Sequence, residues 1–366
     1  MKAISFILAF VKWLVKGGGA FAFTLNESVK KMDTVGKDIL HLRKYAGSSM
    51  INYRNVIAVL LLLAVNVASQ EQIGILKSGV EKWNIWRARN KSVIIHFEGA
   101  DLRLVNLEKA NLVKVSFQGA RLQGAKLQGA YLAGANLHGA NLGGANLHLA
   151  DLWGADLTRA KFHRADLGGA YFQGANLEEA DFQEANLKKA KLHGVNLSRA
   201  NLQGANLEGA YLWGAKFLGA NLYLANLRGA NLQVAYLVEA NLGGACLQGA
   251  YLKETDLVKA NLQKADLSGA NLEEADLQES DLEGADFEGT NLREADLQGT
   301  SLNKAKSFHK TKFDPEVLAK IKTNWPEKLA TIWDDSKKDW VIDYVLLAQI
   351  KKPHWQGWPE EKGQGK

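Results

Sequence analysis

Few side chains in this chain stand in a pattern that could perform catalysis or bind a metal. Four histidines each follow a Leu or Phe inside a long repeated stretch: His138, His148, His163 and His193. No two of these positions differ by a multiple of 20 residues. In a coil of four pentapeptides they therefore fall on four different sides and cannot converge on one metal ion. The single Cys246 excludes an intramolecular disulfide. No catalytic Ser/His/Asp pattern and no nucleotide-binding glycine motif is present, so we expect no enzyme, no cofactor and no metal site.

The elements that position the side chains in the middle of the chain are pentapeptides. From Phe97 to Leu302 every fifth residue is Leu or Phe, which gives 42 consecutive repeats. A small residue, nearly always Ala, stands two positions earlier, as in Ala140-Asn141-Leu142. A period this strict determines the fold before any helix or strand is assigned, because every repeat must form the same structural unit.

A period of five fits neither a helix, with its period of 3.6, nor a long strand, with its period of two. A short extended piece followed by a turn does fit, because the Ala and the Leu or Phe then point to the same side. The other positions are rich in Asn, Asp, Gln, Glu, Lys and Gly, which face outward and suit a corner. We expect stacked Leu, Phe and Ala layers to fill the interior and leave no cavity for a substrate.

The number of sides in one coil is indicated by tyrosines that stand directly before a central Leu or Phe. Four of them recur at every eighth repeat: Tyr131, Tyr171, Tyr211 and Tyr251. This spacing fits coils of four pentapeptides, one for each side, and it does not fit coils of three pentapeptides. Tyr236 departs from the series, so the preference for four sides depends on these four residues.

The Ala-Asn/Asp-Leu-X-X pattern of residues 97–302 resembles the pentapeptide-repeat family, and it covers more than half of the chain. The resemblance implies an all-β solenoid, a right-handed quadrilateral β-helix. In that fold the repeats make about ten and a half coils, roughly 50 Å long at ~4.8 Å per coil. We place the β-helix at residues 92–304, flanked by N-terminal and C-terminal α-helices that must cover its open ends.

The basic character of the chain belongs to its flanks. The net charge is +6, but residues 97–304 carry 19 Lys and Arg against 25 Asp and Glu. Residues 1–96 carry 14 against 5, and residues 305–366 carry 12 against 9. Because the positive charge lies beside apolar segments and not on the repeats, we expect no nucleic acid as a partner.

The N-terminal segment, residues 1–25, is predicted to lie at a membrane surface, with an amphipathic helix over residues 2–16. A lysine stripe lies opposite its apolar side, and a tryptophan suits the bilayer interface. One alternative is a helix packed on another protein element. Another is a secretory signal ending at Ala20-Phe21-Ala22, although Lys12 interrupts the apolar region that such a signal needs. The residues expected to contact lipid are Ile4, Ile7, Leu8, Val11, Trp13 and Leu14.

A membrane helix and a capping helix are predicted within residues 56–90, after a basic connector over residues 26–55. The apolar run from Val56 to Ala68 is shorter than the ~20 residues of a typical span. We favour a single membrane helix with snorkelling ends over a buried helix, and its orientation stays open because basic residues stand on both sides. Residues 71–90 are expected to form a helix that caps the first coil. The lipid-contacting centre of the membrane helix is Val59, Leu60, Leu61, Leu62 and Leu63.

The C-terminal region, residues 305–366, is predicted to be a Trp-rich helical cap. The register of the repeats fails at Ser307, and Asp314-Pro315 predicts a helix start with Pro at the first helical position. A second helix is predicted over residues 336–350. Five tryptophans either cover the last coil or form a docking or membrane-interface surface: Trp325, Trp333, Trp340, Trp355 and Trp358.

Two sets of surface residues are candidate sites. Aromatic residues on one side of the predicted coil form a candidate partner face, unless they are there because aromatics suit exposed strands. Acidic residues near the end of the repeats form a candidate acidic patch or a solvated surface. The candidate partner face is Tyr131, Trp153, Tyr171, Tyr211, Trp213 and Tyr251. The candidate acidic patch is Glu273, Glu274, Asp276, Glu279, Asp281, Glu283, Asp286 and Glu288.

Together these features predict a non-enzymatic, membrane-anchored scaffold or assembly protein that presents a rigid β-helix to a protein partner. The expected partner is a membrane protein complex, with membrane lipid at the N-terminal region. Similar architectures occur among proteins of photosynthetic bacteria, so the resemblance implies a bacterial inner or thylakoid membrane, with single-pass or peripheral attachment. The alternative is a pentapeptide-repeat protein that mimics DNA and binds type II topoisomerases, for which an acidic rod without membrane segments is expected.

Overall fold

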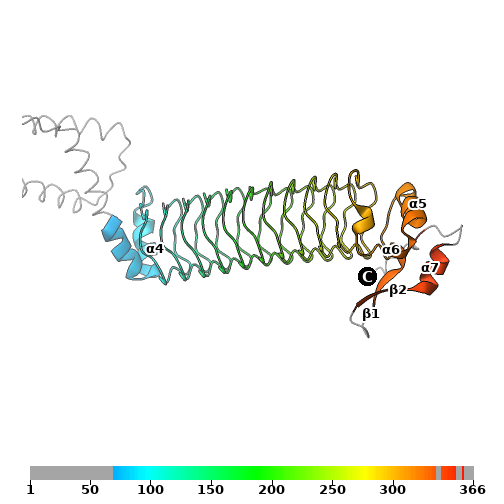
Figure 1. Cartoon of the computed structure of the whole chain (residues 1–366). Helices are drawn as coiled ribbons and strands as arrows, with labels where there is room; N and C mark the ends of the chain where they lie inside the picture. Colours follow the sequence, from blue (N-terminus) through cyan, green and yellow to red (C-terminus); the bar gives the residue numbers. More distant parts are fainter. Residues whose placement is uncertain (1–68, 335–338, 352–356, 358–366) are drawn as a thin grey trace, which may run out of the picture. The chain divides into compact units, whose positions relative to one another are not determined.

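The computed structural model describes residues 69–334, 339–351 and 357, and the chain divides into two compact units, Met1–Phe97 and Glu98–Lys366. The described part of the first unit contains helical residues 69–77 and helix α4 (Val80–Arg89). The second unit contains a long series of coils and a mixed C-terminal region (Figure 1). The elements of that region are η1 (Leu302–Lys304), α5 (Pro315–Asn324), α6 (Pro326–Ala330), β1 (Thr331–Asp334), β2 (Asp339–Ile342) and α7 (Tyr344–Ile350).

The helix predicted over residues 71–90 is interrupted in the structure. Residues 69–77 are helical, Gly79 has a φ of 131°, and α4 then begins at Val80. Glycine tolerates such a φ, but no helix continues through it. Within this unit Trp83 is fully buried, and its ring centroid lies 5.3 Å from that of Trp86 and 5.9 Å from that of Phe97. The expectation that this region caps the first coil stays a prediction.

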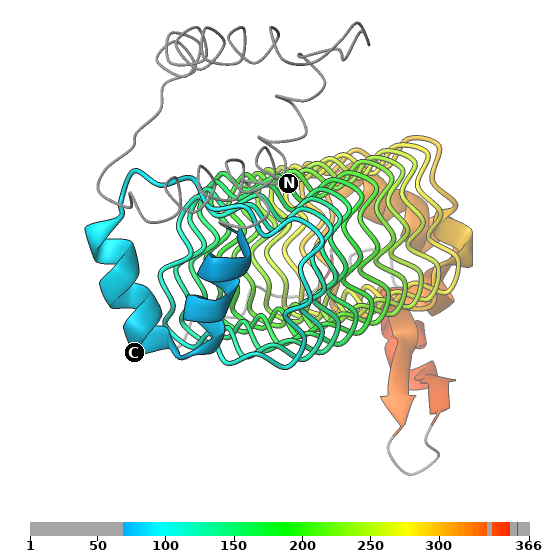
Figure 2. The ribbon, with the colours of Figure 1, turned by 90° about the vertical axis from the view of Figure 1, so that its left-hand side faces the viewer.

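Successive coils of the second unit pair with each other at an offset of four pentapeptides. Parallel single-residue bridges join Tyr131 to Asp151 and Asp151 to Tyr171, and the same pattern continues along the coils. The Leu132 N–H donates to the Asp151 carbonyl at 2.7 Å, and the Asp151 N–H donates to the Ala130 carbonyl at 2.9 Å. The coil of four pentapeptides predicted from the tyrosines is confirmed, and Figure 2 shows the coils stacked behind one another. The extended part of each side is one bridge long, so the coils are not continuous strands.

The interior of the coils is packed with the two residue types predicted to point inward. Leu152 and Ala150, for example, have no exposed surface. Phe162 stacks on Phe182 of the next coil, with 4.8 Å between ring centroids and 3° between ring planes. Phe172 meets Phe182 edge-on at 6.5 Å. Rings at these distances are in contact, so side chains fill the space between the walls.

Each side ends in a tight turn whose third residue has a positive φ. At one corner the Ala235 N–H donates to the Leu232 carbonyl at 3.0 Å, and Val234 between them has a φ of 57°. Glycine is frequent at this position, as expected, but Lys, Arg, Glu and Leu also adopt the same φ at other corners. A β-branched residue is the type least suited to it. The pairing between coils therefore imposes the corner conformation on residues that do not favour it.

The Asn or Asp before the central Leu forms two kinds of hydrogen bond. Asn221 Oδ1 accepts the backbone N–H of Tyr223 at 3.2 Å, which is the local bond expected for a turn residue. Asn221 Nδ2 also donates to Asn201 at 3.1 Å, Asn201 donates to Asp181 at 3.0 Å, and Asn241 donates to Asn221 at 3.2 Å. A carboxylate accepts hydrogen bonds but cannot donate them, which explains why the Asp stands at the start of this ladder.

The last coil contains one extra residue. Asp286 pairs with Ser307 and Asn291 pairs with Lys312, at an offset one residue longer than in the coils before. Between the two paired segments lies the short helix η1, which accommodates the insertion. The boundary of the β-helix predicted at residue 304 is therefore wrong, because the pairing continues to Lys312.

The segment after the coils occupies the open edge of the last coil. The Phe308 N–H donates to the Lys328 carbonyl at 2.7 Å, a bond that a further coil would otherwise supply. The Ser307 hydroxyl donates to the Thr331 carbonyl at 2.9 Å, and Leu329 is fully buried. An unpaired edge would expose these groups to pairing with other chains. Helix α6 and the start of β1 thus form the C-terminal cap.

The C-terminal region is not wholly helical, contrary to the expectation from the sequence. The predicted helix over residues 336–350 is wrong in its first part, because β1 and β2 pair antiparallel, with Ile332 opposite Val341. Only α7 continues the predicted helix. Apolar residues close together fit either structure, and pairing of the two strands decides the outcome. Of the five C-terminal tryptophans, the structure describes the side chain of Trp325, which is partly buried.

A helix begins at Pro315, as predicted from Asp314-Pro315, but the Asp314 side chain does not cap it. Helix α5 begins at Pro315, directly after Asp314. The Asp314 side chain forms no capping bond to its own helix, and its Oδ2 instead accepts the Glu294 N–H at 3.0 Å. This carboxylate therefore ties the start of α5 to a corner of the coils.

Replacing Val234 by Gly should stabilise the protein by about 1 kcal/mol. The change removes the strain of a β-branched residue with a φ of 57°, and the entropy of glycine in the unfolded chain offsets part of the gain. The measurement is urea unfolding followed by circular dichroism. Gly229→Val is the reverse control, because Gly229 has a φ of 61° and nothing lies within 4 Å of an added Cβ. Equal stability of the three proteins would contradict corner strain.

Replacing Asn221 by Asp should lower the free energy of unfolding by about 1–2 kcal/mol at pH 7. The carboxylate could not donate to Asn201 and would face its acceptor oxygen. Asp181→Asn at the start of the ladder is the matched control, and we expect it to change stability by less than about 0.5 kcal/mol. Equal effects in urea unfolding of the two variants would show that the ladder contributes nothing.

Candidate functional site

The six residues of the candidate partner face lie on one side of the coils. The four tyrosines occupy every second coil of one bridge series, and Trp153 and Trp213 stand two residues further along the same side. Their exposed fractions range from 39% for Tyr211 to 62% for Trp153. The grouping inferred from the spacing is thus present in the structure, and its role in binding stays a prediction.

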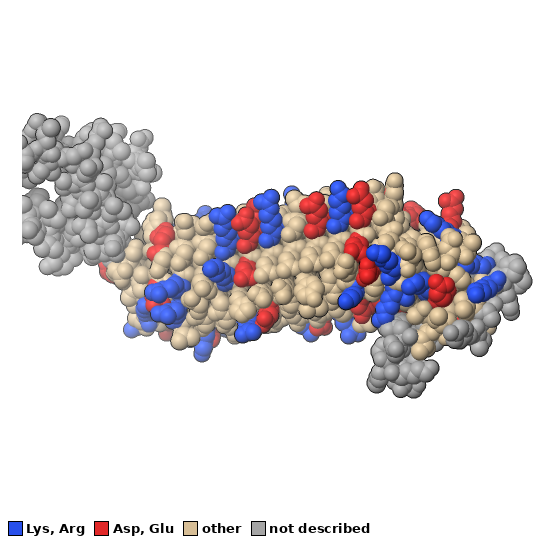
Figure 3. All heavy atoms as spheres, in the orientation of Figure 1, with Lys and Arg blue, Asp and Glu red and all other residues tan. Residues whose placement is uncertain are grey.

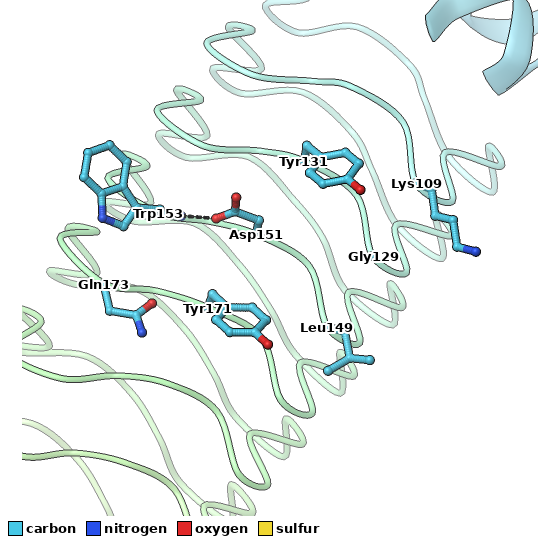
Figure 4. A pocket seen from close by; sticks show the side chains of 8 residues that line it. All are labelled: Lys109, Gly129, Tyr131, Leu149, Asp151, Trp153, Tyr171 and Gln173. Carbon is cyan, nitrogen blue, oxygen red and sulfur yellow. Dashed lines mark hydrogen bonds between the residues drawn. The ribbon is translucent and has the colours of Figure 1, made fainter.

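An open hollow of about 710 Å³ lies on this face. Figure 4 shows Asp151 between Tyr131 and Tyr171, which stand two coils apart. The Trp153 N–H donates to Asp151 Oδ1 at 3.0 Å, so a local turn holds the carboxylate in place. The lining residues are Lys109, Gly129, Tyr131, Leu149, Asp151, Trp153, Tyr171 and Gln173. The hollow is open to solvent and combines exposed aromatic rings with one carboxylate.

Two coils further along the same face, a lysine takes the place of the aspartate. The Lys191 ammonium lies over the ring of Tyr211, with Nζ 3.3 Å from the ring centroid. The His193 ring lies 5.6 Å from the same tyrosine ring. Burial and, to a smaller extent, the charge of Lys191 lower the pKa of His193, because both disfavour the imidazolium form. Neither Asp151 nor Lys191 was predicted from the sequence, although they are two coils apart, like successive tyrosines of the series.

The eight residues of the candidate acidic patch surround the coils and do not share one face. They belong to four consecutive pentapeptides, which form the four sides of one coil. Five of them form ion pairs with lysines. Lysines of the preceding coil pair with three: Glu273 and Glu274 with Lys253 at 3.0 and 2.7 Å, and Glu279 with Lys259 at 3.7 Å. Lysines at the end of the coils pair with the other two: Glu283 with Lys304 at 3.1 Å, and Asp286 with Lys306 at 3.9 Å. The negative charge at this end is therefore distributed and partly compensated.

Charged residues also alternate in sign at the corners. Arg159 pairs with Glu179 at 2.7 Å, and Arg164 pairs with Glu184 at 2.6 Å, each across one coil. Figure 3 shows basic and acidic side chains following one another along an edge of the coils. Hydrogen bonds from the arginines lower the pKa of both glutamates. Exposed pairs of this kind add little stability, but they leave the visible face of the coils mixed in charge.

Asp286 is a buried member of the candidate acidic patch. The residue is 7% exposed, and burial raises the pKa of its carboxyl to about 6 from the ordinary 3.8. Its Oδ1 accepts the Glu288 N–H at 3.1 Å, and this bond and Lys306 oppose the shift. Asp286 pairs with Asp266 and Ser307 in the bridge series at the end of the coils, so its burial is part of the packing of the last coils.

The remaining predicted residues do not come together. Within the described ranges, no group of three or more His, Cys, Asp and Glu residues is placed to hold a metal ion. Cys246 is a free, partly exposed thiol. The predicted lipid contacts between Ile4 and Leu14 and between Val59 and Leu63 lie outside the described residues. In the part of the chain that the structure covers, helices are too short or too polar to cross a bilayer.

The fold defines a class of protein: a parallel solenoid built from coils of four pentapeptides. Six stretches of the chain match the family of pentapeptide repeats: residues 95–129, 125–164, 160–199, 196–233, 235–273 and 270–306. They cover more than half of the chain, so the chain belongs to the pentapeptide-repeat family. Members of this family form a right-handed quadrilateral β-helix, which the offset of the bridges matches.

Solved structures of pentapeptide-repeat proteins are similar to about half of this chain. HetL, a pentapeptide repeat protein involved in heterocyst differentiation regulation from the cyanobacterium Nostoc sp. strain PCC 7120, is 36% identical over 55% of this chain and 86% of that chain, with a TM-score of 0.26. QnrB1, a plasmid-mediated fluoroquinolone resistance protein, in a trypsin-treated form, is 20% identical over 51% of this chain and 93% of QnrB1, with a TM-score of 0.35. A protein from the Arabidopsis thaliana thylakoid lumen is 21% identical over 43% and 90%, with a TM-score of 0.18. No curated protein sequence matches the chain. All three TM-scores are below 0.5, so family membership rests on the repeats.

Replacing Asp286 by Asn should stabilise the protein at high pH and not at low pH. Above pH 6 the folded chain holds a buried charge that the unfolded chain hydrates, which costs up to about 3 kcal/mol for a pKa raised from 3.8 to about 6. Well below pH 3.8 both states are protonated and the difference disappears. Unfolding free energies of the wild type and the variant at about pH 3 and pH 8 test this. A difference that is the same at both pH values would contradict it.

Proposed function

We propose that this chain is a non-enzymatic scaffold that presents the aromatic side of its β-helix to a protein partner, and that its N-terminal region attaches it to a membrane. One observation carries the proposal: half-exposed tyrosines and tryptophans line one side of coils whose interior is packed. Pentapeptide-repeat proteins are generally structural or binding proteins. A packed interior leaves the outer surface as the place where this chain can act.

The aromatic side has the composition of a protein interface. Tyr and Trp are enriched at the centres of interfaces because they bury a large area at a small entropy cost. The rows of single-residue bridges hold these side chains in a fixed register, so little ordering is required on binding. Exposed aromatics also stand elsewhere on the coils, as with Tyr223 and Tyr236, but not in a series that repeats every second coil.

Membrane attachment is supported by the sequence of the N-terminal region. The run from Val56 to Ala68 and the apolar, lysine-striped segment at the start of the chain suit a bilayer and its interface. A membrane protein complex is the partner that an anchored face would meet, in a bacterial inner or thylakoid membrane. The tryptophans of the C-terminal region are a second set of residues that could contact it.

The alternative, DNA mimicry with binding to a type II topoisomerase, requires continuous acidic faces. The acidic residues of this chain instead surround one end, and lysines pair with five of them. Corner rows of alternating sign further reduce the resemblance to a polyanion. We therefore keep topoisomerase binding as an outcome of the experiment below.

The test is fractionation of the full-length chain from its native cells, with carbonate and then detergent, followed by affinity purification. We expect the chain to remain in the membrane through carbonate and to co-purify with subunits of a membrane complex. A soluble chain that co-purifies with a topoisomerase would overturn the scaffold proposal and support the alternative.

Removing rings from the aromatic face should weaken capture of that complex. The triple change Tyr131→Ser, Tyr171→Ser and Tyr251→Ser should lower the recovered partner about 10-fold or more, as expected for interface aromatics. Tyr223→Ser with Tyr236→Ser is the matched control, because these tyrosines are 43% and 48% exposed on other sides. Equal losses in both variants would show that this face is not the docking surface.

A further inference from the structure

Two neighbouring slots on the aromatic face have the same backbone geometry and opposite charges. The first slot consists of Tyr131, Asp151, Trp153 and Tyr171, and the second slot consists of Tyr171, Lys191, His193 and Tyr211. The bridge series gives residue 151 the same place relative to Tyr171 that residue 191 has relative to Tyr211. The tyrosines of one slot are two coils apart, ~9.6 Å at ~4.8 Å per coil, which leaves room for one small group between them.

The second slot contains its own cation. The Lys191 Nζ lies 3.3 Å from the centroid of the Tyr211 ring, inside the distance at which a cation is attracted to an aromatic face. Burial and the charge of Lys191 lower the pKa of His193, which favours the neutral imidazole, so Lys191 is the cation of this slot. A tyrosine at this place on the face therefore accepts a primary ammonium group.

The first slot has the aromatic walls without the cation. Asp151 replaces the lysine and Trp153 replaces the histidine, so a carboxylate and an additional ring stand where Lys191 and His193 stand in the second slot. In the described part of the chain, Asp151 forms no ion pair, and its carboxylate accepts a hydrogen bond from the Trp153 N–H. Lys109 lines the edge of the hollow, and Figure 4 shows its ammonium pointing away from the carboxylate.

We propose that the first slot binds the ammonium group of a lysine side chain from the partner protein. This inference rests on the proposed function and specifies the chemistry of the contact. The Asp151 carboxylate complements the charge, and the exposed rings of Tyr131, Trp153 and Tyr171 provide cation–π contacts. The methylene stem of a lysine packs on apolar surface such as the exposed Leu149 beside the slot. The second slot shows that a lysine side chain suits this register.

Saturation-transfer NMR on the full-length chain in detergent tests the slot directly, with n-butylammonium as the probe and n-butanol as its uncharged control. We expect saturable binding of n-butylammonium and none of n-butanol. Asp151→Lys should reduce the affinity at least about 10-fold, because the new side chain would occupy the slot as Lys191 occupies the second one. Lys191→Asp should create a second site and double the stoichiometry.

Both substitutions place a residue type that the same series already contains, so we expect both variants to fold, and urea unfolding checks this. Equal binding of n-butylammonium by the wild type and the Asp151→Lys variant would overturn the proposal. A second outcome would also overturn it. If n-butylammonium does not bind, but tetramethylammonium or phosphatidylcholine vesicles bind in a way that depends on Asp151, the slot recognises a lipid headgroup.

Capture of the membrane complex distinguishes this proposal from the proposed function. If the triple tyrosine variant loses the complex and Asp151→Lys retains it, the face is a docking surface but the slot does not bind a lysine of the partner. If neither variant loses the complex, the docking role of the face itself fails. Loss in both variants, together with Asp151-dependent binding of n-butylammonium, supports both proposals.

Discussion

The pairing of each coil with the next is the constraint on which the rest of the structure depends. Apart from the turn bond at each corner, the backbone groups of a side pair with the neighbouring coils, as in the bond from the Leu147 N–H to the Asp166 carbonyl at 2.6 Å. One extra residue in a coil would shift every later side chain relative to its neighbours. The uniform length of the repeats is therefore a physical requirement. The insertion at η1 comes where less than a full coil follows.

The same constraint explains why residues at the corners adopt conformations that they do not favour. The hydrogen bonds on both sides of a corner determine its path, so Val234 and many charged residues accept a positive φ. Leucines of the preceding coil lie over some corner glycines. A Cβ added to Gly244 would lie 2.8 Å from Leu224 Cδ2, and one added to Gly124 would lie 2.7 Å from Leu104 Cδ2. A larger residue at either position would therefore displace the end of that leucine side chain.

The sequence was sufficient to predict what depends on period alone. The Leu, Phe and Ala positions predicted the packed interior, and the spacing of four tyrosines predicted the coil of four pentapeptides, because every repeat has the same environment. The ends lack this redundancy. Phe308 follows Leu302 by six residues, so the last pairing was missed, although Phe313 follows Phe308 by five. Strand β2 lies inside the helix predicted over residues 336–350, because a short apolar run fits either structure until it finds a partner.

The candidate site was predictable in its aromatic residues and not in its charges. Tyrosines are conspicuous in a repeat, whereas Asp151 and Lys191 stand among many outward Asp, Asn and Lys residues. Their possible role is visible only in the structure, which places aromatic rings beside each of them. On the proposed mode of binding, the two slots also orient the partner. A lysine placed in the first slot is attracted by Asp151, while the same lysine shifted by two coils would meet the ammonium of Lys191. Charge of opposite sign at equivalent places on a rigid face would therefore select one register along the coils, because electrostatic complementarity contributes more to specificity than to affinity.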